Sequence, residues 1–585
     1  MATIEVSGLT VALESDGATI IEDVSLALEA GEVMGIVGES GSGKSTLALA
    51  LLGYTRPGGK ITSGSVTIEG TDLLGLDEVG LRQARRGLVS YVAQDPATAL
   101  NPAMRIVDQL LEAVEGSRAD SLRQIRETLI SVGLPSDDAF LKKHASELSG
   151  GQQQRIGIAM AVIAKPRLIV LDEPTTGLDV STQMKVLELV KRLCDEHRIA
   201  AIYVTHDLAV VAEVADAVTV MYGGQVVETG PSRDLLRSPS HPYTRALLRA
   251  VPSTERRQML VPIPGRAPSI SDRNPGCVFA KRCAFATEIC HESVPQLERA
   301  GVGEVRCFHH RELEGEGMPV VALAPVRDAE DNTPPLLRVT DLHASYASHT
   351  VLNGIDLEVR PGECIAIVGE SGSGKSTLSR CLIGLHTEWE GEVELDGAPL
   401  ARSAAKRTSE ARRRLQYIFQ NPFGSLNPRL TVGASLTSPL VHFEGLRGEA
   451  ARARAVEALE RVEIPGRTTE LYPAELSGGQ RQRVAIARAL LANPGVLICD
   501  EVTSALDVSV QASVVELLRG LLTDGLGIIF VTHNLAVVRS IADSVAVLNQ
   551  GTIVEHGQVE RVMDNPQDIY TQGLLADTLD LPVAS

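Results

Sequence analysis

The sequence predicts an α/β protein made of two tandem copies of one domain, with a cysteine-containing extension after the first copy. The segment GESGSGKST occurs at 38–46 and recurs unchanged at 369–377. LSGGQ likewise occurs at 148–152 and at 476–480. Short apolar runs end at such motifs, as is typical of buried parallel strands whose carboxyl ends carry the loops of a site. A repeated α/β unit explains all three observations.

Length and composition agree with this prediction. A chain of 585 residues is too long for one core and divides into several domains. Its residues are 44% hydrophobic but only 3% aromatic, which suits strands of Val, Ile, Leu and Ala buried on both faces. The formal net charge of -19 gives no general attraction to nucleic acid or anionic lipid. Without a leader pattern or a long apolar stretch, we expect a protein that is neither secreted nor membrane-spanning.

The individual elements follow in chain order. Apolar runs at Val33–Val37, 168–171 and Ala200–Val204 predict three central strands of the first copy. Helical patterns at 47–52 and 378–385 follow the two GESGSGKST segments. The amphipathic stretches between the strands make each copy α/β.

The domain boundaries follow from the repeat. A stretch between the copies is rich in acidic residues and proline, which indicates an exposed linker. We therefore expect a first domain over 1–235, its extension over 236–310, a linker over 311–335, a second domain over 336–560 and a short C-terminal extension over 561–585.

The two GESGSGKST segments match the phosphate-binding loop pattern G-x4-G-K-S. Their glycines let backbone N–H groups surround phosphate oxygens, the lysine adds a positive charge, and the serine hydroxyl reaches Mg²⁺. An apolar strand before each loop and a helix after it make a simple Gly-rich surface turn a poor explanation. The predicted phosphate-binding residues are Gly38, Ser40, Gly41, Gly43, Lys44, Ser45 and Thr46, and Gly369, Ser371, Gly372, Gly374, Lys375, Ser376 and Thr377.

Two adjacent carboxylates end an apolar strand in each copy, in LIVLDE at 168–173 and LICDE at 497–501. Both pairs stand at the same distance after LSGGQ. An isolated acidic pair is usually a solvated strand end, but this spacing favours a catalytic role. We expect Asp172 and Asp500 to hold Mg²⁺, with Ser45 and Ser376, and Glu173 and Glu501 to orient or deprotonate the attacking water.

With these motifs, each copy resembles an ATP-binding cassette of the ABC family, whose signature is LSGGQ. The resemblance covers most of the chain. It implies that the signature of one cassette contacts the γ-phosphate held by the other, so that two ATP molecules lie between the cassettes of an intramolecular pseudodimer. The signature residues concerned are Ser149, Gly150, Gly151 and Gln152, and Ser477, Gly478, Gly479 and Gln480.

The resemblance also assigns roles to single residues. Gln94 and Gln420 match the glutamine that meets Mg²⁺ and the transmembrane partner, His206 and His533 match the histidine at the γ-phosphate, and Asp179 and Asp507 match the loop that crosses between cassettes. Tyr346 fits the aromatic residue that stacks on adenine, where the first copy has Leu13. Since every reactive group is duplicated, we expect two competent ATP sites.

A second resemblance concerns the extension. HPYT at 241–244 and the cysteine-bearing segment from Gly276 resemble the C-terminal region of ATPases from oligopeptide and dipeptide importers, with glutathione and nickel relatives. This resemblance implies that Cys277, Cys283, Cys290 and Cys307 bind a structural 4Fe–4S cluster. Zinc and unligated thiols remain alternatives. The thiolate ligands of zinc, however, commonly come in pairs that are closer in sequence than these cysteines.

Together these features predict the ATP-hydrolysing subunit of an importer for peptides or peptide-like solutes. Such a chain would sit at the cytoplasmic face of the cell membrane, recruit two permease subunits and, through them, serve an extracytoplasmic substrate-binding protein. A soluble twin cassette acting on ribosomes or nucleic acid is the alternative, disfavoured by the acidic balance and the lack of a basic linker. A purely structural ATP-binding module is disfavoured because every hydrolytic group is present twice.

Overall fold

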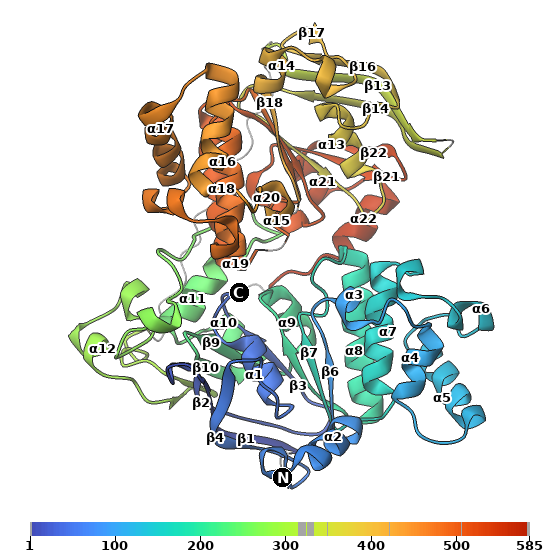
Figure 1. Ribbon diagram of the computed structural model, residues 1–585, viewed down its shortest axis with the longest axis vertical. Helices are drawn as coiled ribbons and strands as arrows, with labels where there is room; N and C mark the ends of the chain where they lie inside the picture. The colour runs from blue at the N-terminus through green and yellow to red at the C-terminus, as the bar shows by residue number, and fades with distance from the viewer. Residues whose placement is uncertain are drawn as a thin grey trace.

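The computed structural model describes residues 3–313, 323, 333–347, 349–420, 422–504 and 506–581. The two copies lie one above the other, with the first copy at the bottom and the second at the top of Figure 1. Most of the linker predicted over 311–335 lies outside the described residues. None of the helices in the described ranges has the length and apolar character needed to cross a membrane.

A mostly parallel sheet forms the centre of the first copy. Strands β3 (Val33–Val37), β7 (Leu168–Asp172) and β8 (Ala200–Val204) are buried at every residue, so the three predicted apolar runs are confirmed. The parallel strands run in the order β9-β3-β8-β7-β6, with β6 at Val89–Val92 and β9 at Ala217–Tyr222. A second, antiparallel sheet has the order β2-β1-β4-β5 and comprises β1 (Ile4–Leu13), β2 (Thr19–Leu28), β4 (Gly59–Ile68) and β5 (Thr71–Asp72).

Helices cover this sheet and form a separate helical lobe. Helix α1 spans Lys44–Ala50, so the predicted helix begins earlier than 47 and ends before 52. A second apolar core gathers the lobe around α7, where Ile156 and Ala159 are fully buried. The other helices of the copy are α2 (Glu78–Gly87), α3 (Pro96–Ala99), α4 (Ile106–Glu112), α5 (Arg118–Ser131), α6 (Asp138–Leu141), α7 (Gly150–Val162), α8 (Val180–His197), α9 (Leu208–Val214) and α10 (Ser232–Arg237).

The extension continues the sheet of the first copy. Strand β10 (Gln225–Pro231) pairs with β9 on one side and with β12 (Gly303–Val305) on the other, and β11 (Glu298–Ala300) forms the edge. Helices α11 (Pro242–Arg249) and α12 (Glu288–Glu292) lie between them in the chain and occupy the left of Figure 1. The extension is therefore built into the first copy.

The second copy repeats the plan. Its mostly parallel sheet runs β18-β19-β20-β15-β21-β22, and its antiparallel sheet runs β14-β13-β16-β17. Helix α13 stops at Ile383 because Gly384 adopts a left-handed conformation (φ 76°), so Leu385 of the predicted 378–385 helix lies beyond it. The strands are β13 (Leu337–Tyr346), β14 (His349–Val359), β15 (Cys364–Val368), β16 (Trp389–Leu395), β17 (Ala398–Pro399), β18 (Leu415–Ile418), β19 (Val496–Asp500), β20 (Gly527–Val531), β21 (Ser544–Asn549) and β22 (Thr552–Gln558).

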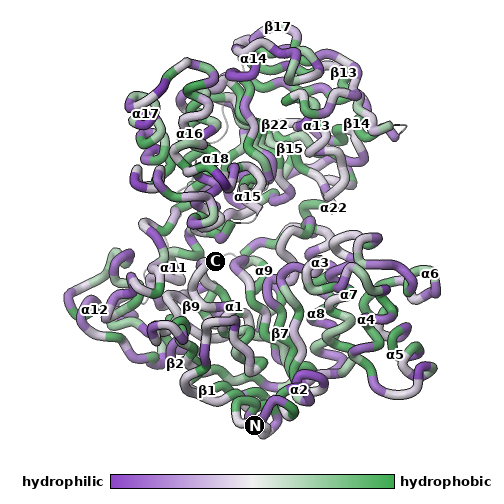
Figure 2. The backbone as a smooth tube through the Cα atoms, viewed as in Figure 1, coloured by the Kyte–Doolittle hydropathy of each residue, from purple (hydrophilic) through white to green (hydrophobic). Residues whose placement is uncertain are grey.

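The helices of the second copy also match those of the first in order. Hydrophobic segments, green in Figure 2, follow the central strands of both copies, and hydrophilic segments mark outer helices such as α12 and α14. The helices are α13 (Lys375–Ile383), α14 (Ser409–Arg414), α15 (Pro422–Ser425), α16 (Val432–Pro439), α17 (Gly448–Arg461), α18 (Gly478–Leu490), α19 (Val508–Thr523), α20 (Leu535–Ile541), α21 (Val559–Asp564) and α22 (Ile569–Ala576).

The chain after α11 docks the first copy onto the second. Arg257 donates hydrogen bonds to the Ala542 carbonyl (2.9 Å) and to the Glu560 carboxylate (3.0 Å). The backbone N–H of Leu260 donates to Glu516 (3.0 Å). One continuous apolar core includes side chains of the extension and of the second copy. The contacts between the copies therefore rest largely on the extension.

Candidate functional site

Each phosphate-binding loop leaves its central strand through a glycine that has no room for a side chain. A Cβ atom at Gly38 would lie 2.2 Å from the carbonyl oxygen of Met221, and one at Gly369 would lie 2.1 Å from that of Leu548. Gly43 and Gly374 cap the following helices with positive φ angles of 100° and 110°. These glycines let the loop fold tightly and aim its N–H groups inward.

The loop lysines are buried and held by the loop itself. Lys44 Nζ donates to the carbonyl oxygens of Gly38 (2.6 Å) and Glu39 (3.1 Å). Lys375 Nζ makes the equivalent bonds to Gly369 (2.7 Å) and Glu370 (2.8 Å). Burial lowers the pKa of both lysines, and nearby carboxylates oppose this effect. A phosphate in the loop would offer each ammonium group a charged acceptor in place of the carbonyls.

The aspartates at the strand ends accept hydrogen bonds from nearby hydroxyl groups. Ser45 Oγ donates to Asp172 Oδ1 (3.2 Å), and the Tyr91 hydroxyl donates to Asp172 Oδ2 (3.0 Å). In the second copy the Tyr417 hydroxyl donates to Asp500 Oδ2, whereas Asp500 Oδ1 is buried and has no hydrogen-bond partner among the residues that the structure describes. A buried carboxylate oxygen that lacks a donor fits a bound cation or its water shell, so these residues suit Mg²⁺.

The neighbouring glutamates are set up differently from the aspartates. Glu173 accepts hydrogen bonds from Gln94 Nε2 (2.8 Å) and Thr176 Oγ1 (3.1 Å), and pairs with His206 Nδ1 (3.2 Å). Burial would raise the pKa of Glu173, but His206 and Lys44 lower it to about 2. Burial alone would lower the pKa of His206, yet the Glu173 carboxylate raises it. The glutamate is therefore ionised and can accept a proton or orient a water molecule.

The second copy repeats this arrangement. Gln420 Nε2 donates to Glu501 Oε2, and His533 Nδ1 lies 3.4 Å from Glu501 Oε1. Burial would raise the pKa of Glu501, but His533 and Lys375 lower it. Burial raises the pKa of the adjacent Asp500, as it does that of Asp172. In both copies the two adjacent carboxylates thus differ in environment, as two different roles require.

The signature serines begin helices of the helical lobes. Ser149 and Ser477 cap α7 and α18, and each shares a reciprocal pair of bonds with the glutamine three residues later, Gln152 or Gln480. These helix N-termini carry unpaired N–H groups and a positive dipole end, both of which favour an anion.

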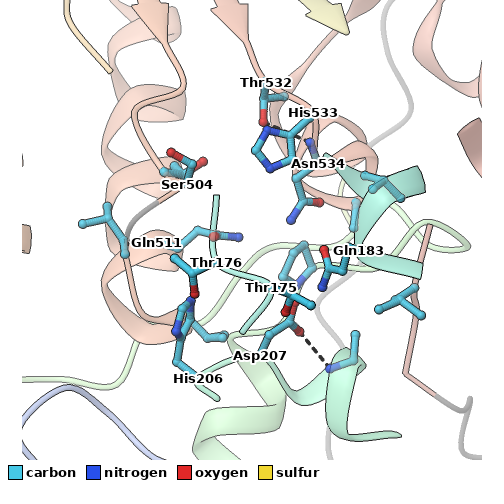
Figure 3. Close-up of a pocket in the computed structure, with 18 of the residues that line it drawn as sticks. Thr175, Thr176, Gln183, His206, Asp207, Ser504, Gln511, Thr532, His533 and Asn534 are labelled. Carbon is cyan, nitrogen blue, oxygen red and sulfur yellow. Dashed lines mark hydrogen bonds between the residues drawn. The ribbon is translucent and has the colours of Figure 1, made fainter. Parts of the chain in front are cut away.

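The cassettes bring complementary motifs together. Glu39 and Ser40 of the first phosphate loop share one cavity with Ser477, Gly479 and Gln480 of the second signature. Asp179 lines another cavity together with Gly369 and Glu370 of the second loop. A third cavity lies between the copies, and His206 and His533 face it from opposite sides (Figure 3). The phosphate loop of one copy thus faces groups of the other.

The predicted adenine position differs between the copies, as the sequence indicates. Tyr346 and Leu13 each stand at the end of the first strand of their copy, β13 and β1. Tyr346 is 43% exposed, and its ring lies 4.3 Å from the His386 ring, centroid to centroid. At this position an aromatic side chain is thus available to adenine in the second copy but not in the first.

The four cysteines of the extension line one small cavity, together with His241, Phe279, Phe285 and Phe308 among other residues. The backbone N–H of Cys277 donates to the Cys290 carbonyl (2.8 Å), and a Cβ atom at Gly276 would lie only 2.5 Å from that oxygen. The glycine before Cys277 therefore permits this approach.

The thiols themselves are free and partly or fully buried. Burial raises the pKa of Cys283 to about 11 and that of Cys307 to about 12, and also raises that of Cys277. Within the described ranges, no three histidine, cysteine, aspartate or glutamate side chains are grouped closely enough to form a metal site. The donors share a cavity, but they do not form a preassembled metal site.

Sequence reasoning did not assign two pairs of tyrosines that touch the site. Tyr91 and Tyr417 hold the strand-end aspartates, and the hydroxyls of Tyr243 and Tyr570 accept from the backbone N–H of Glu39 and Glu370 (2.8 Å each). Each pair occupies equivalent positions in the two copies. The recurrence of a tyrosine at the same position of both copies is the sequence signal that could have identified these residues.

Known protein families match both copies and the extension. The ABC transporter family matches residues 21–176 and 352–504, and the C-terminal region of oligopeptide/dipeptide transporters matches 227–290. The chain is similar to the oligopeptide transport ATP-binding protein OppD of Mycobacterium bovis, at 39% identity over 98% of this chain and 97% of the relative. It is also 38% identical to the glutathione import ATP-binding protein GsiA of Salmonella typhimurium, over 98% of this chain and 89% of that one.

Proposed function

The chain belongs to the ABC transporter family, and from this premise we propose that it is the ATP-hydrolysing subunit that energises an importer of peptides or peptide-like solutes. The observation that carries the proposal is the cavity shared by the first phosphate loop and the second signature. ATP held there would touch both cassettes. Its hydrolysis would let the cassettes part, and the permease would follow that motion.

The residues divide the chemistry among them. Backbone N–H groups of the loops and the ammonium groups of Lys44 and Lys375 bind phosphate. Ser45, Gln94 and Asp172, with Ser376, Gln420 and Asp500, would hold Mg²⁺, which neutralises phosphate charge when it is bound. Glu173 and Glu501 orient the attacking water, and His206 and His533 hold these carboxylates in place while facing the γ-phosphate.

The proposed partners follow from the relatives, which are named as transport and import ATP-binding proteins. The chain would bind two permease subunits at the cytoplasmic face of the membrane and serve an extracytoplasmic substrate-binding protein through them. The proposal includes domain boundaries at residues 235, 310, 335 and 560, which separate the first cassette, its extension, the linker, the second cassette and the C-terminal extension. No observation favours ribosomes or nucleic acid.

A 4Fe–4S cluster held by Cys277, Cys283, Cys290 and Cys307 is part of the proposal. Its support is the convergence of four thiols on one cavity. Burial raises the pKa of Cys277, Cys283 and Cys307, so loading the site must release protons, and it must also draw the sulfurs together. The role would be structural, because the cavity belongs to the extension.

Hydrolysis and partner binding test the main proposal. Purified chain should release phosphate from ATP only with Mg²⁺, and Lys44→Ala with Lys375→Ala should abolish nucleotide binding. Chain purified from its native membranes should carry permease subunits. Ribosomal RNA in place of permease would contradict the importer function and support the alternative.

A further inference from the structure

Glu39 of the first phosphate loop is tied to the extension by an ion pair. Its carboxylate accepts hydrogen bonds from Arg282 Nη1 (2.5 Å) and Nη2 (3.2 Å). The two side chains are only 5% and 6% exposed, so solvent screens the pair weakly. Glu39 directly follows Gly38, and both supply carbonyl oxygens to Lys44. The ion pair therefore acts on the backbone that would bind phosphate.

Arg282 is fixed from several other directions. Its Nε donates to the Pro264 carbonyl (2.7 Å) and its Nη2 to the Ile263 carbonyl (3.1 Å). Its Nη1 also donates to the Tyr222 hydroxyl (3.1 Å), and the guanidinium lies 5.7 Å from the centre of that ring. With its planar group held at both edges, Arg282 can fix the position of Glu39.

The second copy lacks this restraint. Glu370 occupies the same position as Glu39, and its backbone N–H makes the same bond to a tyrosine hydroxyl, that of Tyr570. No hydrogen bond or ion pair of the Glu370 carboxylate occurs among the described residues. The two loops thus share the tyrosine contact, and the arginine distinguishes them.

We propose that Arg282 is a positioning residue for the first ATP site only: it holds Glu39 and thereby keeps the first phosphate loop in its binding conformation. The inference rests on the proposed function, because it requires that both loops bind ATP. Arg282 also lies in the turn between Cys277 and Cys283, which line the cysteine cavity. The state of the extension would therefore reach the first site through this side chain and leave the second site unaffected.

The test isolates each site within the full chain. Lys375→Ala leaves the first site to be titrated with a fluorescent ATP analogue, and Lys44→Ala leaves the second. Arg282→Lys keeps the charge but loses the two-pronged contact. It should weaken analogue binding about tenfold in the Lys375→Ala chain, equivalent to one charge-assisted hydrogen bond. In the Lys44→Ala chain it should change binding less than twofold.

A matched control and a second variant keep the test decisive. Arg273 is another arginine of the extension, and it donates to the carbonyls of Thr19 and Ile20 on β2. Arg273→Lys should leave the affinity of the first site unchanged. Glu39→Ala, which retains the other contacts of Arg282, should weaken the first site as Arg282→Lys does, and the double variant should be no weaker than Glu39→Ala alone.

The possible outcomes distinguish a failure of the positioning role of Arg282 from a failure of the proposed ATPase function. Equal weakening of both sites by Arg282→Lys, or an equal effect of Arg273→Lys, would overturn the positioning role, and so would unchanged binding. Failure of the parent Lys375→Ala and Lys44→Ala chains to bind the analogue at all would instead contradict the proposed function. If Arg282→Lys lowers the melting temperature strongly, Glu39→Ala decides the question.

Discussion

At the scale of single residues, the two glutamates at the strand ends are strained. Glu173 and Glu501 adopt left-handed backbone conformations with φ angles of 48° and 47°, directly after buried strands. Such a conformation costs about 1–3 kcal/mol at a residue with a side chain. The turn directs each carboxylate to a histidine and a glutamine, as the pairs Glu173–His206 and Glu501–His533 record. Strain at this position supports a functional role for the side chain.

The combined variant Glu173→Gln and Glu501→Gln should bind ATP with near-normal affinity but hydrolyse it about 10² to 10⁴ times more slowly. The amide keeps the size and one hydrogen-bond acceptor of each side chain, but it cannot take a proton from water. Phosphate release by purified protein measures the rate. Glu196→Gln, an exposed change on α8, serves as control. Wild-type turnover in the double variant would reject the assignment.

The pKa of Glu173 predicts how acid affects stability. Burial would raise this pKa, but His206 and Lys44 lower it from 4.5 to about 2. A depressed pKa stabilises the folded chain above pH 4.5, and this contribution is lost as the pH falls from about 4.5 to 2. In that window His206 is protonated in both the folded and the unfolded chain.

Wild type should therefore lose about 3 kcal/mol of unfolding free energy relative to Glu173→Gln between pH 5 and pH 2. Urea unfolding of the two proteins at each pH measures the difference, in which the titration of groups that do not interact with Glu173 cancels. A difference that does not change with pH would show that Glu173 is not held ionised by its neighbours.

At the scale of elements, the two signature glycines have different neighbours. A Cβ atom at Gly151 would lie 2.7 Å from Thr182 Cγ2 on α8, whereas one at Gly150 would meet nothing within 4 Å. Gly151→Ala should therefore push α7 away from α8 and destabilise the first cassette by about 1–3 kcal/mol. Gly150→Ala should leave stability unchanged or slightly higher, since alanine favours a helix. Urea unfolding compares the two, and equal stability would contradict the close packing of these helices.

The cysteine cavity gives a second prediction for an element. Protein purified without oxygen should be brown and hold about four iron atoms per chain, and Cys277→Ser with Cys290→Ser should abolish both. Cys194→Ser, a buried cysteine of α8 outside the cavity, is the control. Colourless protein with one zinc per chain would favour the zinc alternative, and protein without metal would favour free thiols.

Local pattern predicted the central strands well because each is a short apolar run that ends at a motif. The limits of Val33–Val37 and Ala200–Val204 were predicted without error. Helix ends were less accurate, since a left-handed glycine such as Gly384 stops α13 earlier than hydrophobic periodicity indicates. The continuation of the sheet by β12 and β11 gave no signal, because those strands have only three residues each.

At the scale of the whole molecule, the sequence could predict that the phosphate loop of one copy faces groups of the other, but not which residues hold the two copies and the extension together. The pairing of Arg282 with Glu39 joins residues 243 positions apart, and that of Arg257 with Glu560 joins residues 303 positions apart. No local pattern encodes such partners. The extension therefore contacts the first phosphate loop, and the segment after α11 contacts the second cassette.

The largest-scale prediction concerns the composite sites. Ser40 and Ser477 line the same cavity although they belong to different cassettes, whereas Ser149 is not among the residues that line it. Cysteines introduced at Ser40 and Ser477 should be joined by a short thiol-specific crosslinker, more completely with ATP in the Glu173→Gln, Glu501→Gln background, because slow hydrolysis keeps nucleotide between the cassettes. Mass spectrometry of linked peptides measures the product. The unsubstituted chain, treated in the same way, gives the background from crosslinks between native cysteines. The control pair, Ser40→Cys with Ser149→Cys, should stay unlinked. Crosslinks confined to the first cassette would show that each site is built from one copy alone.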